Sequence, residues 1–167
     1  VSREEALDRI RAAVDARNEL VATGGPETLI LARTDSRHEH GLAEAIERSA
    51  RFAELGADIL FIEAPQTESE MTEICRSLPG PKMANIVEGG LTPELPLEAL
   101  QAIGYSLAAY PLTLLAAAMK AMTNSLRAMR SQSALDLMDF GELRERVGFN
   151  DYYEISARYS SSNRESG

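Results

Sequence analysis

The chain has 167 residues, 44% of them hydrophobic and 26% charged, which is typical of one soluble globular domain with a real core. The formal net charge of −9, with no run of Lys and Arg, disfavours nucleic acid as a partner. No apolar run is long enough for a membrane span, and the start does not resemble a signal peptide. The single cysteine, Cys75, excludes an internal disulfide and indicates a reducing, cytoplasmic compartment.

The beginning of the chain reads directly as a helix. Ser2 and Glu5 have the spacing of a capping box, and apolar residues at near-helical spacing follow, which predicts a helix over residues 3–18. Because the sequence has no initiator Met and opens inside an element, we expect it to begin partway through a larger fold.

Four predicted strand–helix pairs come next. Short apolar runs bounded by turn residues predict strands, and amphipathic segments after them predict helices. The predicted strands cover residues 28–33, 58–62, 82–87 and 105–109, and the helices cover residues 42–55, 68–78, 96–103 and 113–130. This alternation predicts an α/β fold with a parallel sheet. A complete (β/α)8 TIM barrel needs roughly 200 residues or more, so we predict about half of one.

The last third of the chain changes character. Leu135 to Phe140 suggest a short helix, Gly141 and Gly148 are expected to break the chain, and residues 150–159 are predicted to be a final helix. We therefore expect a helical extension over 131–159. The composition of residues 160–167 predicts a flexible tail.

Polar side chains stand where the predicted strands end, which is where parallel α/β folds bind ligands. They are Arg33 with Asp35, Glu63, Asn85 with Glu88, and Tyr110. An Arg fork suits a carboxylate, an Asn amide can donate to a second oxygen, and a Glu can hold a metal-bound water or accept a proton. For each residue taken alone, an ion-paired role on the surface remains the alternative. That alternative explains less well why three polar residues stand at the same position, the end, of successive strands.

Other polar residues carry weaker signals. His38 and His40 are expected in a loop, either as acid/base groups or, with more weight, as solvated residues. Cys75 is expected to be inert in a helix. No metalloprotease, CxxC, phosphate-loop or dinucleotide motif is present.

Several segments together resemble one known family. They are VSREEALDRIRAAVDARN, LILARTDSR, GLAEAIERSARFAELGADILFIEAP, MANIVEGGLTP and IGYSLAAYPL. In this order and spacing they resemble the C-terminal half of the isocitrate lyase/phosphoenolpyruvate mutase superfamily. The resemblance covers residues 1–130, with a weaker echo in GFNDYYEISARYS.

The resemblance implies a (β/α)8 barrel in which the helix at residues 113–130 is swapped between subunits, giving a homodimer or homotetramer. It also implies Mg²⁺ as cofactor and a small carboxylate as substrate. Carried over by position, the resemblance implies that Arg33, Asn85 and Glu88 bind the substrate and that Glu63 is catalytic. The family's Mg²⁺-binding aspartates and its loop with an acid/base Cys match nothing here and are expected upstream of Val1.

The resemblance leaves several functions open. The first is a Mg²⁺-dependent lyase or phosphonomutase, similar to carboxyvinyl-carboxyphosphonate phosphorylmutase, that makes or breaks a C–C or P–C bond beside an oxo or enol carboxylate. The alternatives are a 2-methylisocitrate lyase, an oxaloacetate decarboxylase, or a non-catalytic truncated paralogue that serves as an oligomerisation module. This chain alone is expected to be inactive. The absence of a cation at residues 113–117 argues against a tricarboxylic substrate.

Overall fold

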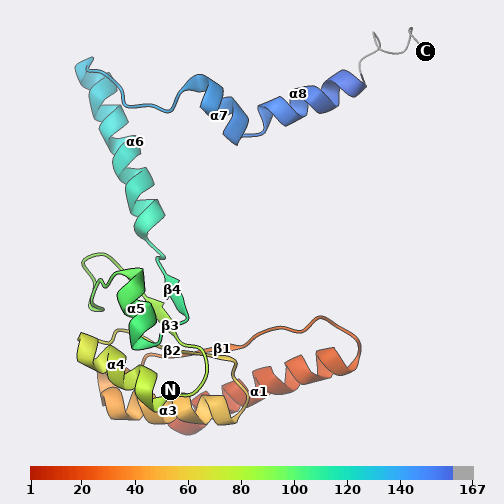
Figure 1. Cartoon of the computed structure of the whole chain (residues 1–167), viewed down its shortest axis with the longest axis vertical. Coiled ribbons are helices and arrows are strands. Elements are labelled where there is room, and N and C mark those ends of the chain that lie inside the picture. Colours follow the sequence, from red (N-terminus) through yellow and green to blue (C-terminus); the bar gives the residue numbers. More distant parts are fainter. Residues whose placement is uncertain (160–167) are drawn as a thin grey trace. The chain divides into compact units, whose positions relative to one another are not determined.

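The computed structural model describes residues 1–159, so the tail predicted over residues 160–167 lies outside the described residues. The chain divides into two units, Val1–Ala117 and Ala118–Gly167, and each is described by itself. Among the described residues, the first unit holds every strand and alternates strands with helices (Figure 1). This order confirms the predicted α/β class. The domain boundary predicted at residue 130 stays a prediction.

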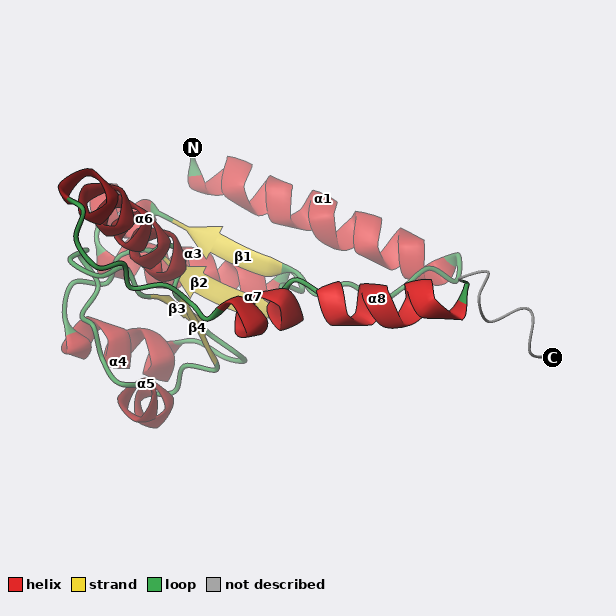
Figure 2. Ribbon diagram, turned by 90° about the horizontal axis from the view of Figure 1, so that it is seen from above, coloured by secondary structure: helices red, strands yellow, loops and turns green. Residues whose placement is uncertain are grey.

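The strands are parallel and follow one another in chain order. β1 (Leu31–Thr34) pairs with β2 (Ile59–Ile62), and β3 (Met83–Asn85) pairs with β4 (Leu107–Ala109). A bridge between Leu60 and Lys82 joins the two pairs. Figure 2 shows β1 and β2 side by side. Because all of these pairings are parallel, the carboxyl ends of the strands face the same edge.

One core cluster lies between α3 (Leu42–Glu54) and the first strand pair. α3 turns Ala45, Ser49 and Phe52 inward, and burying a Phe side chain contributes about 2–3 kcal/mol. α1 (Arg3–Ala22) and α4 (Glu68–Ser77) also pack near this cluster. Its buried members are Ala32, Ala45, Phe52, Leu60, Ile62, Ile74 and Leu78.

α1 begins as predicted, since the Ser2 hydroxyl accepts a hydrogen bond from the N–H of Glu5 at 3.1 Å. It runs to Ala22 instead of residue 18, because good helix formers continue up to the Thr23 cap and the glycines after it. A second core cluster joins α4, β3 and α5 (Leu97–Ile103). Its members are Met71, Ala84, Ile86, Leu100 and Tyr105.

The segment with His38 and His40 is not the predicted loop. Residues Ser36–His40 form the short helix α2 directly after β1. Buried Ser36 and the ion pair of Arg37 with Glu70 hold this turn of helix against the body of the unit. Both histidines are exposed on it.

The helices after β4 are α6 (Thr113–Ser131), α7 (Phe140–Arg146) and α8 (Phe149–Arg158). The short helix predicted around residues 135–140 is wrong, because the helix starts at Phe140 and includes Gly141. Asp139 explains this start, since its carboxylate accepts from the N–H groups of Gly141 and Glu142 at 2.8 and 3.3 Å. Gly148, with φ 78°, separates α7 from α8 as expected. No helix within residues 1–159 is both long and apolar enough to cross a membrane.

Candidate active site

The structure brings Arg33, Glu63 and Asn85 together at the carboxyl ends of β1, β2 and β3. The Nη2 atom of Arg33 lies 3.4 Å from Oε2 of Glu63. The side-chain amide of Asn85 lies 3.3 and 3.4 Å from the two carboxylate oxygens of Glu63. The predicted convergence of a guanidinium, a carboxylate and an amide is therefore present. Their chemical roles stay a prediction.

Arg33 is held from two directions. Its Nε and Nη2 atoms donate to Asp35 at 2.6 and 3.2 Å, and its guanidinium stands 5.1 Å from the centre of the Phe61 ring. The hydrogen bond to Asp35 is the main reason that the pKa of Arg33 is raised. The side chain is still 48% exposed, and among residues 1–159 its Nη1 atom has no hydrogen-bond partner, so it can still receive an anionic ligand.

Glu63 follows directly after β2 and is more enclosed than Arg33, with 25% of its side chain exposed. Its backbone N–H donates to the carbonyl of Thr34 at 3.0 Å, which anchors it to β1. The next residue, Ala64, has φ 55°. A left-handed backbone at a residue with a Cβ costs roughly 1–2 kcal/mol, so the surrounding contacts must hold this turn.

A small cavity of about 210 Å³ opens beside Glu63 and Asn85. The loop after β3 closes its other side through Val87, Gly90, Leu91 and Thr92. This size suits a small organic acid better than a nucleotide, since pockets for drug-sized ligands hold roughly 300–1,000 Å³.

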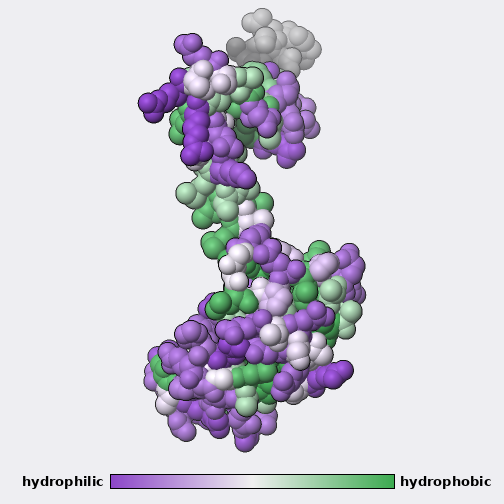
Figure 3. All heavy atoms as spheres, turned by 90° about the vertical axis from the view of Figure 1, so that its left-hand side faces the viewer, coloured by the Kyte–Doolittle hydropathy of each residue, from purple (hydrophilic) through white to green (hydrophobic). Residues whose placement is uncertain are grey.

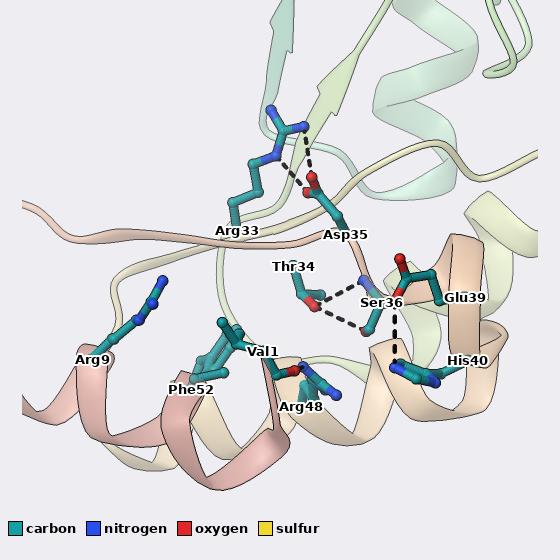
Figure 4. Close-up of a pocket in the computed structure, with 11 residues that line it drawn as sticks. Val1, Arg9, Arg33, Thr34, Asp35, Ser36, Glu39, His40, Arg48 and Phe52 are labelled. Carbon is teal, nitrogen blue, oxygen red and sulfur yellow. Dashed lines mark hydrogen bonds and ion pairs between the residues drawn. The ribbon is translucent and has the colours of Figure 1, made fainter.

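Arg33 also borders a larger hollow of about 410 Å³ on the side of α1 and α3. Figure 4 shows Arg33 and Asp35 pointing one way from the strand, while Ser36 and Arg48 lie on its other side. The Thr34 and Ser36 hydroxyls lie 2.9 Å apart, and Nη1 of Arg48 donates to the carbonyl of Val1 at 3.3 Å. These groups satisfy one another, which is typical of a structural network.

The other candidates lie apart from this group. The Glu88 carboxylate accepts from the Thr113 hydroxyl at 2.5 Å, which lowers the pKa of Glu88, and no contact within residues 1–159 links it to Glu63 or Arg33. Burial raises the pKa of the Cys75 thiol, as expected for an inert cysteine. His40 lies 3.8 Å from Glu39 on the exposed face of α2.

The part of the chain that the structure describes holds no group of three or more His, Cys, Asp or Glu side chains arranged for a metal ion. Glu63 is of the right chemical type for Mg²⁺, which prefers oxygen ligands, but one carboxylate does not make a site. The residues present therefore do not build a magnesium site by themselves.

Sequence reasoning missed Phe61, which supports the Arg33 guanidinium. The parallel register places Arg33 directly opposite Phe61, so the strand pairing could have identified it. Leu91 and Thr92, which follow the Gly89-Gly90 turn, also line the cavity.

The chain is similar in sequence to known lyases and mutases. A family model described as phosphoenolpyruvate phosphomutase matches residues 1–130. The 2,3-dimethylmalate lyase of Eubacterium barkeri is 39% identical over 166 residues, which are 96% of this chain and 55% of that protein. The chloroplastic carboxyvinyl-carboxyphosphonate phosphorylmutase of Arabidopsis thaliana is 32% identical over 95% of this chain and 47% of its own length. The chain thus spans about half the length of the curated relatives that it matches.

A solved structure of oxaloacetate acetylhydrolase in complex with the product oxalate superposes with a TM-score of 0.84 at 29% identity. The match covers 94% of this chain and 54% of that structure, which is a TIM-barrel-like protein. The predicted fold, about half of a (β/α)8 barrel, is confirmed.

Proposed function

The chain belongs to the phosphoenolpyruvate phosphomutase family, within the isocitrate lyase superfamily of lyases and mutases, and from that premise we propose that it supplies the substrate-binding half of such an enzyme. The reaction makes or breaks a C–C or P–C bond of a small carboxylate, and an oxo or enol carboxylate is its substrate or its product. The observation that carries this proposal is the convergence of Arg33, Glu63 and Asn85 on one edge of the parallel strands.

Each of these residues has a separate task in the proposal. Arg33 orients the substrate by pairing with its carboxylate, using the donors that Asp35 leaves exposed. Asn85 donates to a second substrate oxygen, with its amide held beside Glu63. Glu63 holds a substrate hydroxyl or accepts a proton at the wall of the small cavity. Glu88 stays a proposed substrate contact, although in this structure its carboxylate binds Thr113.

C–C bond cleavage of a dicarboxylate is the form of the reaction that we favour. The relative at 39% identity is named a lyase of 2,3-dimethylmalate, a dicarboxylate. Residues 113–117 contain no cation that could meet a third carboxylate, which disfavours 2-methylisocitrate. A P–C bond rearrangement, as the name of the phosphorylmutase relative suggests, is the second candidate, because that relative matches over a similar span.

Dependence on Mg²⁺ is part of the proposal. Glu63 is the ligand that this chain could offer, and further oxygen ligands would have to come from the part of the relatives' length that the chain does not span. When bound, the ion would supply Lewis-acid stabilisation of negative charge on the substrate.

We further propose a homodimer or homotetramer formed through α6. No residue of α6 is buried, and its apolar side chains are widely exposed (Figure 3). They include Leu115 at 56%, Met119 and Met122 at 58%, Leu126 at 67% and Met129 at 63%. An apolar surface of this kind is usually covered by another protein surface. Sedimentation analysis of the wild type and of Met122→Glu tests this, and an unchanged molecular mass would contradict it.

The activity test uses the longest natural protein that contains this chain. Oxaloacetate, 2,3-dimethylmalate and 2-methylisocitrate are supplied with Mg²⁺ or with a chelator, and the products are measured by NMR. Arg33→Ala should lower kcat/KM by at least about a hundredfold, because a charge-assisted contact is lost. The matched control is Arg76→Ala, since Arg76 is an exposed arginine on α4. An unchanged kcat/KM in Arg33→Ala removes Arg33 from the site. Absence of any wild-type turnover supports the non-catalytic alternative.

A further inference from the structure

The loop over residues 63–67 joins β2 to α4 and carries Glu63. Ala64 has φ 55° and precedes Pro65, so this turn is costly for a residue with a Cβ. Two hydrogen bonds bracket it: Glu63 N–H donates to the Thr34 carbonyl at 3.0 Å, and Gln66 N–H donates to Oε2 of Glu70 at 2.7 Å. The unfavourable turn is therefore held at both ends.

The carboxylate at the second end is itself firmly held. Arg37 donates to Glu70 from Nε at 3.1 Å and from Nη2 at 2.6 Å, with 14% and 22% of the two side chains exposed. The N–H of Glu70 also donates to the hydroxyl of Thr67, the cap of α4, at 3.1 Å. The guanidinium of Arg37 lowers the pKa of Glu70, so the carboxylate is ionised at neutral pH.

This ion pair connects the two segments that carry the candidate site. Arg37 lies in α2, four residues after Arg33, and Glu70 lies in the first turn of α4, seven residues after Glu63. The carboxylate of Glu70 therefore connects the segment that follows β1 with the loop that follows β2. No contact within residues 1–159 joins Glu70 directly to Glu63 or Asn85.

We propose that Glu70 is a positioning residue for Glu63. By accepting the Gln66 N–H while paired with Arg37, it keeps Ala64 in the left-handed turn and so directs the Glu63 carboxylate toward Asn85 and Arg33. The importance of Glu70 for catalysis rests on the proposed function. The effect of Glu70 on the geometry around Asn85 is independent of that function and can be measured without substrate.

The alternative is that Glu70 only caps α4. In that case its removal lowers the melting temperature but leaves the surroundings of Asn85 unchanged in the folded protein. The two roles therefore differ in a measurement that reports on the Asn85 side-chain amide, which donates to the Glu63 carboxylate.

The experiment records the side-chain amide signals of Asn85 by ¹H–¹⁵N NMR on the whole chain, without substrate. The signals are assigned by their loss in Asn85→Ser. Glu70→Ala should shift them, and Glu70→Gln, which retains an acceptor for Gln66, should shift them less. The matched control Glu68→Gln removes a charge from the same helix turn, at a side chain with no partner among the described residues, and should leave them in place.

A rescue variant tests the route through Ala64. Glycine adopts a positive φ without strain, so adding Ala64→Gly to Glu70→Ala should largely return the Asn85 signals to their wild-type positions. In the active enzyme, Glu70→Ala should lower kcat about tenfold or more with a smaller change in KM, because the carboxylate is misplaced and the Arg33 contact is kept.

Unchanged Asn85 signals in folded Glu70→Ala would overturn the proposal, as would equal shifts in Glu68→Gln. If Glu70→Ala does not fold, Glu70→Gln decides by the same signals: a shift larger than that in Glu68→Gln supports the proposal, and a shift no larger than that overturns it. Failure of the proposed function would appear separately. The wild-type protein would then show no turnover, while the Asn85 signals would still shift in the Glu70 variants.

Discussion

The side-chain amide of Asn85 donates to the Glu63 carboxylate across the junction between the two strand pairs, at 3.3 Å to one oxygen and 3.4 Å to the other. Glu63 follows β2 and Asn85 ends β3, and a bridge between Leu60 and Lys82 is the backbone pairing that joins these strands. The candidate site thus lies where the two pairs meet, and its side chains help to hold that junction together.

We expect Asn85→Asp to disrupt this contact through charge. The change places a second carboxylate within hydrogen-bond distance of Glu63 and replaces attraction with repulsion. For groups at this partly exposed position, the free energy of unfolding should fall by about 1–2 kcal/mol at pH 7. The repulsion disappears when the pair takes up a proton, so the difference from the wild type should shrink in acid.

Urea unfolding of both proteins between pH 4 and pH 8 measures the effect of Asn85→Asp. The control is Asn18→Asp, because Asn18 lies on the outer surface of α1, remote from this site. A difference in unfolding free energy that does not vary with pH would show that the two side chains are not electrostatically coupled.

Acid should loosen the attachment of α1 to α3. Glu44 on α3 accepts hydrogen bonds from Arg3 on α1 and from Arg48, and these contacts lower the pKa of Glu44 from 4.5 to about 2. Because the folded pKa lies below the unfolded one, this stabilisation is complete above about pH 4.5 and is lost as the pH falls toward 2.

Glu44→Gln should therefore lower the melting temperature near neutral pH, and its difference from the wild type should narrow as the pH falls from 5 toward 2.5. Thermal unfolding followed by circular dichroism gives both curves. Glu73→Gln is the matched control, since Glu73 is exposed on α4 and has no ion-pair partner among the described residues. Parallel curves for Glu44→Gln and the wild type would contradict this assignment.

The order of elements could be predicted because it depends on local signals. The Ser2 cap, the short apolar runs and the Gly residues after helices all act within a few residues. The helix α2 could not be predicted, since a five-residue helix depends on tertiary contacts such as that of Arg37 with Glu70. The expectation that Gly141 would break the chain was wrong, because the side chain of Asp139 caps the helix that begins at Phe140.

The site was predictable to a similar degree. Arg33, Glu63 and Asn85 could be predicted because each stands at the carboxyl end of a strand. In a parallel sheet these ends share one edge, which brings the three side chains together. The left-handed turn at Ala64 could not be predicted, since alanine carries no preference for a positive φ. The role of Glu88 stays a prediction, and its hydrogen bond from the Thr113 hydroxyl could not be predicted because the two residues are 25 positions apart in the sequence.

Ser49→Ala should stabilise the protein. The Ser49 hydroxyl lies fully buried in the face of α3 against the strands, with no hydrogen-bond partner in the part of the chain that the structure describes. A buried polar group without a partner costs about 1–3 kcal/mol, and alanine fits the same space. We expect the free energy of unfolding to rise by about 1 kcal/mol, as measured by urea unfolding.

The control for Ser49→Ala is Ser69→Ala on the exposed side of α4, which measures the gain from helix propensity alone. Equal gains in the two variants would mean that burial of the Ser49 hydroxyl carries no penalty.

Lys82→Met should destabilise the first unit. Lys82 is 8% exposed, and its Nζ atom donates to the carbonyls of Leu78 and Gly80 at 3.2 and 2.7 Å, just beyond the end of α4. Methionine matches the stem in length but leaves both carbonyls without this donor and removes a positive charge from the carboxyl end of the helix. The free energy of unfolding should therefore fall by about 1–3 kcal/mol in urea unfolding.

The control Lys120→Met, at an exposed position on α6, should leave the free energy of unfolding within about 0.5 kcal/mol of the wild type. A stable Lys82→Met protein would mean that the cost of burying the ammonium group cancels the energy of its two hydrogen bonds.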